Sequence, residues 1–190
     1  MHEEKELEVK LAIRDPEVAR RVLTSHGFEY EDTCLEVDIY YAHPCRDFVK
    51  TDEALRFRTR KCNASSHYAV SYKGPRERGI TGLKIRTELE IVVDELAWTT
   101  LRSIVEKLGF KPIAEFAKMR ELYKAPRMKA TLDTLFGVGF FLEVELDRME
   151  DVTKLNDLLG KIERNTAIST IDKTYLEICL ETGKCRPRVE

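Results

Sequence analysis

The sequence predicts an α+β domain in which a closed antiparallel β-barrel forms a charged tunnel and helices pack on its outside. Charged residues alternate with aliphatic ones over residues 6–11 and again over residues 141–146, near opposite ends of the chain. On a strand, this period of two places the charges on one face and the aliphatics on the other. Amphipathic helical segments separate such strands along the sequence. Both observations favour a sheet with one charged face and one face covered by helices.

Each alternating stretch has an ordinary explanation by itself, since a half-buried strand exposes charged residues to water. The pattern recurs, however, over residues 55–60, 70–73 and 117–120, where the charges are basic, and over residues 83–91, which mix both signs on one face. An open sheet would scatter these charges in solvent. A closed barrel would gather them around a lumen, whose low-dielectric wall focuses the field on a bound anion. We therefore favour the barrel.

Caps and breakers delimit the expected helices. Asp15 and Pro16 begin the first, which ends at Gly27, and the second runs from about Asp94 to Leu108. The buried side of the second helix is expected to contain Leu96, Leu101, Ile104, Val105 and Leu108. Apolar spacing over residues 151–162 outlines a third helix, and residues 173–180 a short fourth. These helices would cover the apolar exterior of the barrel.

Glycine and proline indicate turns at residues 43–47 and 74–79, because they interrupt ladder pairing. In the second turn, Arg76 and Arg78 are either solvated loop charges or part of a lid over the tunnel mouth. The 190 residues suit one domain, residues 1–183, followed by a flexible tail at residues 184–190. An apolar exterior that the helices cover only in part would allow a homodimer.

Composition excludes several classes of protein. With 32 basic and 34 acidic residues the net charge is −2, which gives no excess for binding nucleic acid or an anionic membrane. No apolar stretch suits a signal peptide or a membrane span, so a cytoplasmic protein is expected. The five cysteines are widely spaced without a C-x-x-C pair, which predicts reduced thiols, although a Cys34–Cys45 bridge stays open.

Common catalytic motifs are missing from the sequence. The four histidines fall at the N-terminus, a helix end and loops, so no histidine base is predicted. There is no G-x-S-x-G elbow, Walker A sequence or G-x-G-x-x-G sequence. Covalent catalysis and the usual nucleotide-binding loops are therefore not expected.

The charged segments, in this order, resemble the CYTH or triphosphate tunnel metalloenzyme superfamily, which includes class IV adenylyl cyclases and thiamine triphosphatases. The opening Glu6-Leu7-Glu8-Val9-Lys10 is similar to the ExExK signature of that family. The other matching segments are Asp38-Ile39-Tyr40-Tyr41, Leu55-Arg56-Phe57-Arg58, Tyr72-Lys73-Gly74-Pro75, Arg86-Thr87-Glu88-Leu89-Glu90, Lys118-Met119-Arg120, Leu132-Asp133, residues 139–145 and Tyr175-Leu176-Glu177. The resemblance covers almost the whole chain and implies a single CYTH domain with a tunnel of about eight strands.

The resemblance also implies roles for the charged residues. Hard Mg²⁺ or Mn²⁺ ions prefer carboxylate oxygen, and the expected metal ligands are Glu6, Glu8, Glu143 and Glu145, with Asp133 and Glu90 as accessory ligands or partners. The expected phosphate-binding residues are Lys10, Arg56, Arg58, Lys73, Arg86, Lys118 and Arg120. Of these, Lys10, Lys73, Lys118 and Arg120 are the catalytic candidates. Glu88 is expected to buffer neighbouring cations, and any single basic residue could instead form a surface ion pair worth roughly 0–1 kcal/mol.

Three functions fit these residues. A class IV adenylyl cyclase would convert ATP to 3′,5′-cyclic AMP and pyrophosphate, and this reading is favoured because the segments 38–41 and 137–140 resemble the class IV cyclase branch. A triphosphatase would hydrolyse thiamine, nucleoside or inorganic triphosphate in the same tunnel. A non-catalytic polyphosphate-binding module would need the basic residues but not both acidic pairs.

Overall fold

The computed structural model describes residues 4–63, 65–78 and 84–187, which form nine strands and four α-helices. The strands are β1 (Glu4–Ile13), β2 (Glu29–Ala42), β3 (Ala54–Cys62), β4 (Ser66–Arg78), β5 (Lys84–Val93), β6 (Lys111–Ala125), β7 (Met128–Leu135), β8 (Gly139–Leu146) and β9 (Ala167–Thr170). The helices are α1 (Pro16–Ser25), α2 (Glu95–Lys107), α3 (Val152–Asn165) and α4 (Tyr175–Thr182), and a 3₁₀ turn precedes α3 at Met149–Asp151. None of the described helices is long and apolar enough to cross a membrane.

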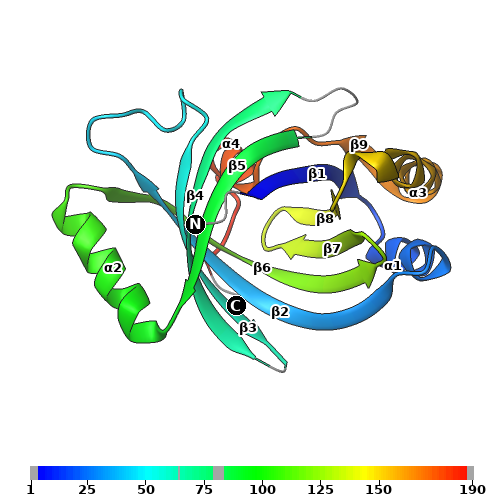
Figure 1. The fold of residues 1–190 in the computed structure, drawn as a ribbon, viewed down its shortest axis with the longest axis horizontal. Helices are drawn as coiled ribbons and strands as arrows, with labels where there is room; N and C mark the ends of the chain where they lie inside the picture. Colours follow the sequence, from blue (N-terminus) through cyan, green and yellow to red (C-terminus); the bar gives the residue numbers. More distant parts are fainter. Residues whose placement is uncertain (1–3, 64, 79–83, 188–190) are drawn as a thin grey trace.

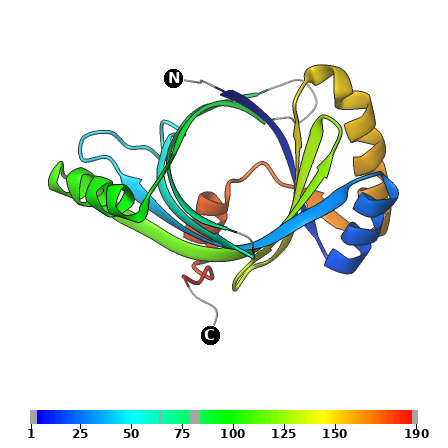
Figure 2. The same ribbon diagram turned by 60° about the horizontal axis from the view of Figure 1, so that its bottom comes forward.

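All the strands belong to one curled antiparallel sheet, in the order β5-β4-β3-β2-β6-β7-β8-β1-β9 (Figure 1). In addition, β1 pairs with β5, with Glu4–Glu8 opposite Lys84–Glu88. Figure 2 shows the strands bending around a common axis, with α1 and α3 on one side and α2 on another. The expected α+β architecture, a large antiparallel sheet with helices packed on its outside, is confirmed for these three helices.

The alternation in β1 sorts its side chains as the sequence predicts. Leu7, Val9 and Leu11 are buried in a core that α1 and α3 complete from outside. On the opposite face, Glu8 and Lys10 line a cavity. Burial of each large aliphatic side chain contributes about 1.5–3 kcal/mol, which fixes the orientation of the strand. The charged face therefore points inward because the apolar face is held outside.

Helix α2 packs through a narrower stripe than expected. Trp98 is buried, and Leu101 and Val105 pack with it over the outer side of β2, β3 and β4. These residues follow an i, i+3, i+7 spacing, which gives a single narrow contact line. Three residues expected on the buried side are instead exposed, by 77%, 47% and 65% respectively: Leu96, Ile104 and Leu108.

The fourth helix is not on the exterior as expected, because α4 lines the inner cavity. Thr174 and Glu177 form a reciprocal capping box at its start, and Gly183 ends it with a φ of 62°. Its residues Tyr175 and Leu176 are buried against the sheet. In Figure 2, α4 lies within the outline of the curled sheet.

Residues 184–187, expected to begin a flexible tail, are held against the domain. Cys185 forms a disulfide with Cys179 of α4. The backbone of Arg186 accepts a hydrogen bond from Ala117 at 2.8 Å and donates one to Phe136 at 3.3 Å. Residues 188–190 lie outside the described part of the chain.

The segment expected to turn at Gly74 and Pro75 belongs instead to β4. The ladder between β4 and β5 shifts register between Lys73 and Arg76. A bulge of this kind accommodates proline, which has no N–H to donate to the ladder. Residue 79, the end of the expected turn, is outside the described residues. The other expected turn, residues 43–47, is confirmed as irregular chain between β2 and β3.

The expectation of reduced cysteines is wrong for four of the five, because Cys34 bonds to Cys62 and Cys179 to Cys185. Cys45 is free and exposed, so the alternative Cys34–Cys45 bridge is also absent. Cys34 and Cys62 lie directly opposite each other on β2 and β3. Their separation of 28 residues gives no local signal, since only the strand register brings them together.

Replacing Cys34 and Cys62 together with alanine is expected to lower the free energy of unfolding by about 3–4 kcal/mol. The bond closes a long loop, and its loss releases the entropy of the unfolded chain. Urea unfolding under oxidising conditions measures the change. Cys45→Ala, which removes an exposed free thiol, is the matched control and should leave the midpoint unchanged. A wild-type midpoint in the double variant would contradict the prediction.

Candidate active site

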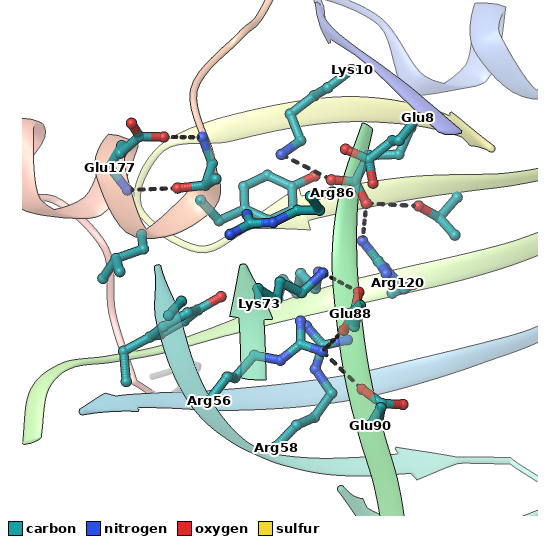
Figure 3. Close-up of a pocket in the computed structure, with 18 of the residues that line it drawn as sticks. Glu8, Lys10, Arg56, Arg58, Lys73, Arg86, Glu88, Glu90, Arg120 and Glu177 are labelled. Carbon is teal, nitrogen blue, oxygen red and sulfur yellow. Dashed lines mark hydrogen bonds and ion pairs between the residues drawn. The ribbon is translucent and has the colours of Figure 1, made fainter. Parts of the chain in front are cut away.

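A cavity of about 610 Å³ lies on the inner face of the curled sheet. Charged side chains from β1, β3, β4, β5, β6 and β8 line it, together with part of α4 (Figure 3). Pockets that bind small molecules and cofactors typically measure about 300–1,000 Å³. The cavity is therefore large enough for a nucleotide-sized molecule.

All the basic residues that the sequence predicts for phosphate binding line this cavity. They are Lys10, Arg56, Arg58, Lys73, Arg86, Lys118 and Arg120. The sheet thus brings together positive charges from distant parts of the chain. Most of these side chains are buried, so they are shielded from bulk water. Such shielding strengthens their attraction for an anion. Their individual roles stay predictions.

The strand register places a carboxylate directly opposite most of these cations. The opposed pairs are Lys10–Glu143, Arg58–Asp38, Lys73–Glu88, Lys118–Glu36 and Arg120–Asp133. Residues opposed across an antiparallel ladder share one face, with Cβ atoms about 4.5–5.5 Å apart. Each cation is thus held from a neighbouring strand.

Bidentate pairs orient two of the arginines. Arg58 donates to both oxygens of Asp38, at 2.6 and 2.7 Å, and Arg120 donates to both oxygens of Asp133. The hydroxyl of Tyr175 also donates to Asp133, at 2.7 Å. Asp133 is fully buried and is not part of the cavity lining. Asp133 therefore lies behind Arg120 and orients it, as expected of a partner, and a role as an accessory metal ligand stays a prediction.

Around Arg56 and Lys73, the partners are glutamates of β5. Lys73 pairs with Glu88 at 2.6 Å, and Arg56 lies 3.3 Å from Glu88 and 3.0 Å from Glu90. Glu88 thus contacts both cations, as its expected buffering role requires. Glu90, expected as an accessory metal ligand, lines the cavity and pairs with Arg56. Arg86 donates to the carbonyl oxygen of Gly74 at 3.0 and 2.6 Å.

Three of the four principal carboxylates predicted for metal line one region of the cavity. Glu8 and Glu145 are opposed across the ladder, and Glu143 lies 2.9 Å from Lys10 and contacts Arg120. The side chain of Glu6, the fourth, lies outside the described part of the structure. An all-oxygen donor set of this kind fits Mg²⁺ or Mn²⁺.

Among the side chains that the structure describes, a single group has three potential ligand atoms within 4.8 Å of one another: Asp32, Cys34 and Cys62. Its two sulfurs form a disulfide, so they are not available as thiolate ligands. The carboxylates of the cavity are therefore the better candidates for holding a metal ion.

The charges of the cavity shift one another's pKa values. Burial works against the charge of Glu143, but Lys10 and Arg120 outweigh it and hold the pKa of Glu143 well below its usual range. Burial also opposes the charge of Lys10, yet Glu143 and Glu8 raise the pKa of Lys10. For Lys118, burial and then the nearby Arg120 lower the pKa. The ion pairs thus keep Lys10 and Glu143 charged at neutral pH.

The structure brings two further residues to the cations of the cavity: Glu36, which sequence reasoning did not select, and Tyr175, which it matched only as part of the segment Tyr175-Leu176-Glu177. Glu36 is buried among the cations, and the ring of Tyr175 lies 4.0 Å from the Lys10 ammonium and 4.5 Å from that of Lys118. Leu35-Glu36-Val37-Asp38-Ile39 shows the same period of two as the other inner strands, so this test could have found Glu36. Tyr175 reaches the cavity from α4, so the period-two test for inner strands does not apply to it.

Arg76 lies on β4 and links this strand to α4. It is therefore neither a solvated loop charge nor part of a loop that forms a lid. Its guanidinium lies 2.8 Å from Asp52 and 2.8 Å from Glu177, and it donates to the carbonyl of Asp172 at 2.7 Å. These contacts hold the start of α4 at the cavity. The side chain of Arg78 lies outside the described part of the structure.

Comparison with known proteins gives a consistent family assignment. The CYTH domain family model matches residues 4–175. A protein of Methanocaldococcus jannaschii named "putative adenylate cyclase" is 34% identical over 178 residues, which cover 91% of this chain and 97% of that protein.

Solved structures show the same fold. A Pyrococcus horikoshii protein superposes with a TM-score of 0.75 and 31% identity, covering 93% of this chain and 98% of its own. A Hippeastrum protein described as a "putative adenylyl cyclase" with a dominant triphosphatase activity superposes with a TM-score of 0.68 and 20% identity, covering 96% of this chain and 98% of its own. At that identity, the second likeness concerns the fold alone.

Proposed function

The chain belongs to the CYTH domain family, and from this premise we propose that it is a metal-dependent enzyme acting on a triphosphate, with cyclisation of ATP to 3′,5′-cyclic AMP and pyrophosphate as its reaction. The observation that carries the proposal is the convergence of the seven predicted phosphate-binding residues, from five strands, on one cavity that also contains Glu8, Glu143 and Glu145. The cyclase name of the relative that is 34% identical supports the choice of reaction.

In this proposal the strands act as a closed tunnel, because β1 pairs with β8 on one side and with β5 on the other. The basic residues would bind the oxygens of the triphosphate and neutralise the charge that repels a nucleophile. Arginine can engage two oxygens at once, whereas lysine places a compact charge at one. The opposed carboxylates hold these cations in place before substrate enters, so little reorganisation is needed.

Glu8, Glu143 and Glu145, with Glu6 by sequence, would hold Mg²⁺ or Mn²⁺. A bound divalent ion would neutralise phosphate oxygens and stabilise the charge of the leaving group. The chain's own contribution is to hold the triphosphate so that the ribose 3′-hydroxyl lies in line with the α-phosphorus. Lys10 and Arg120, which contact Glu143, lie where they can bind phosphate oxygens next to the carboxylates.

Hydrolysis of a triphosphate is the alternative reaction. The same cations and carboxylates would serve it, with water as the nucleophile at the terminal phosphorus. The Hippeastrum protein of the same fold is described as having a dominant triphosphatase activity. Hydrolysis is therefore the reaction against which cyclisation has to be tested.

Product analysis separates the reactions. We expect purified protein with ATP and Mn²⁺ or Mg²⁺ to form cyclic AMP and pyrophosphate in equal amounts. Chromatography of the nucleotide products, with a colorimetric assay for orthophosphate, measures the outcome. ADP with orthophosphate would replace the cyclase assignment with the triphosphatase, and hydrolysis of tripolyphosphate without turnover of ATP would exclude the cyclase.

A further inference from the structure

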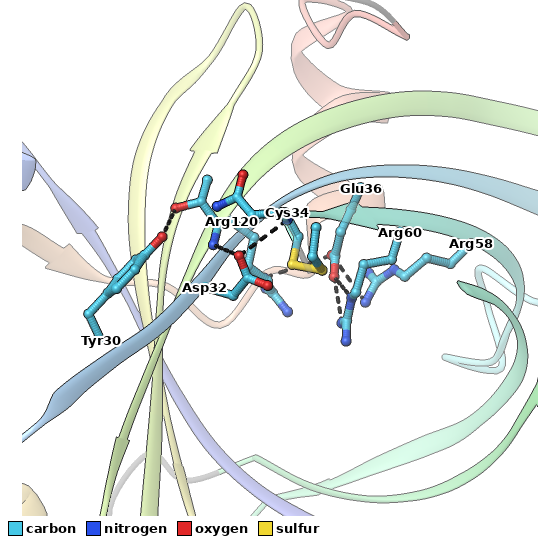
Figure 4. Close-up of a disulfide and its surroundings, with 10 residues drawn as sticks. Tyr30, Asp32, Cys34, Glu36, Arg58, Arg60 and Arg120 are labelled. Carbon is cyan, nitrogen blue, oxygen red and sulfur yellow. Dashed lines mark hydrogen bonds and ion pairs between the residues drawn. A yellow bond between two sulfur atoms is a disulfide. The ribbon is translucent and has the colours of Figure 1, made fainter. Parts of the chain in front are cut away.

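Glu36 is a carboxylate that four basic residues of the cavity wall share. Its Oε1 pairs with Arg60 at 2.5 Å, and its Oε2 lies 3.2 Å from Arg58, 3.3 Å from Lys118 and 3.8 Å from Arg120. The side chain is fully buried and is not part of the cavity lining, whereas its four partners all line the cavity. Figure 4 shows the carboxylate facing Arg58 and Arg60.

The sheet fixes this position from both sides. Glu36 on β2 is opposed to Arg60 on β3 and to Lys118 on β6. Arg58 and Arg120 lie two positions from these partners and therefore share the inner face. The carboxylate thus reaches all four cations through the register of three neighbouring strands.

One atom of Glu36 has an unusual environment. Its Oε2 accepts no hydrogen bond of normal geometry although it is buried. A buried acceptor in this state calls for an explanation, since most such atoms are hydrogen-bonded. Here three cationic groups surround the oxygen, and it cannot align with all of them at once. Its role is therefore that of a shared counter-charge, without which like charges at this spacing would repel one another.

Other charged groups complete the surroundings. Asp38 holds Arg58 from β2, Asp133 holds Arg120 from β7, and the Tyr175 ring contacts Lys118 from α4. Each of these groups orients one or two cations, whereas Glu36 contacts cations from both β3 and β6. Among the carboxylates that the structure describes here, Glu36 is the one that links the cations of β3 to those of β6.

We propose, building on the triphosphate-binding function above, that Glu36 is a positioning residue that holds Arg58, Lys118 and Arg120 together as a preassembled anion-binding cluster. Glu36 touches neither substrate nor metal in this arrangement. A bound triphosphate would add negative charge on the cavity side, so that the three cations lie between two anionic layers. The carboxylate therefore stabilises the cluster before substrate arrives.

The test uses the full chain with Glu36→Gln, which keeps the shape and removes the charge. Thermal unfolding is followed in EDTA, with and without tripolyphosphate. Without the anion we expect a melting temperature lower by on the order of 10 °C, because the cations lose their counter-charge. Tripolyphosphate should then raise the melting temperature of the variant by more than it raises that of the wild type. In turnover assays, kcat should fall roughly 10²-fold with a smaller change in KM, as expected for misplaced groups.

Glu121→Gln is the matched control. Glu121 lies on β6 and pairs with Arg20 of α1 at 2.5 Å, away from the cavity lining. This variant should show the wild-type response to tripolyphosphate. If Glu36→Gln also shows that response, the inference is overturned, whereas a larger response supports it.

The test remains decisive if Glu36→Gln does not fold or if the wild type is inactive. If Glu36→Gln does not fold, Glu36→Asp replaces it, since it keeps the charge and shortens the reach by one methylene. We expect that variant to keep the anion response and to lose roughly 10-fold in kcat, and a wild-type kcat would overturn the inference. If the wild type forms none of the expected products, the proposed function fails, but the unfolding comparison in EDTA still decides the role of Glu36.

Discussion

Lys118→Met should lower kcat/KM for the triphosphate by about 10²–10³-fold, the loss typical of one preorganised charge at the reacting group. The ammonium of Lys118 is buried at the cavity wall, where low dielectric strengthens its attraction for a phosphate oxygen. Methionine keeps an unbranched stem of similar length and removes the charge. Glu36 and Asp133 retain Arg58 and Arg120 as partners, so no carboxylate is left unpaired and the variant should fold.

Initial rates with ATP and Mn²⁺ measure this effect, and circular dichroism verifies folding. Lys124→Met is the control, because Lys124 lies on the same strand, β6, but its side chain is 64% exposed. That variant should keep wild-type rates. Loss of activity confined to Lys118→Met would support a phosphate contact, and equal rates in both variants would argue against it.

Glu143→Gln should reduce metal-dependent turnover by at least about 10²-fold, because it removes a charged oxygen ligand next to the triphosphate. Binding of tripolyphosphate in EDTA should persist and could only strengthen, since Lys10 and Arg120 lose a competing carboxylate. Titration with Mn²⁺ before the rate assay, followed by calorimetry in EDTA, separates the two effects. The addition of Glu145→Gln should deepen the loss of turnover.

Asp151→Asn controls for the cost of neutralising a buried carboxylate. Asp151 is 4% exposed and pairs with Arg127 at 3.3 Å and Lys154 at 3.4 Å, but it does not line the cavity. We expect Asp151→Asn to lose about as much stability as Glu143→Gln does and to keep the wild-type turnover. If Glu143→Gln kept wild-type turnover, the carboxylate would have no part in catalysis, and a protein that binds the anion without any turnover to lose would be a binding module.

Local sequence patterns were sufficient for the orientation of the strands and for most helix ends. The alternation of Leu7, Val9 and Leu11 with Glu8 and Lys10 predicted which face is buried, because burial of aliphatics decides the orientation of a strand. Helix α1 begins where Asp15 and Pro16 indicate, with the Asp15 carboxylate accepting from two backbone N–H groups.

The remaining features depend on long-range pairing, which no local pattern encodes. Only the register of β2 against β3 and β6 shows that Glu36 is shared between Arg60 and Lys118. The same register explains the Cys34–Cys62 bond. Helix α2 exposes part of its apolar surface because the sheet offers it a single line of contact, and this depends on the curvature of the sheet rather than on the spacing of leucines.

The contacts of the last described residues bear on where the protein can be shortened. An expression fragment that stops at residue 183 would remove Cys185 and with it the bond to Cys179, and would also remove the backbone of Arg186 that binds Ala117. Ala117 immediately precedes Lys118, so the end of the chain is hydrogen-bonded to the strand that carries Lys118 into the cavity. The smallest unit fit for assay therefore extends through residue 187, and a purification tag at the carboxyl end needs a spacer that leaves this segment in place.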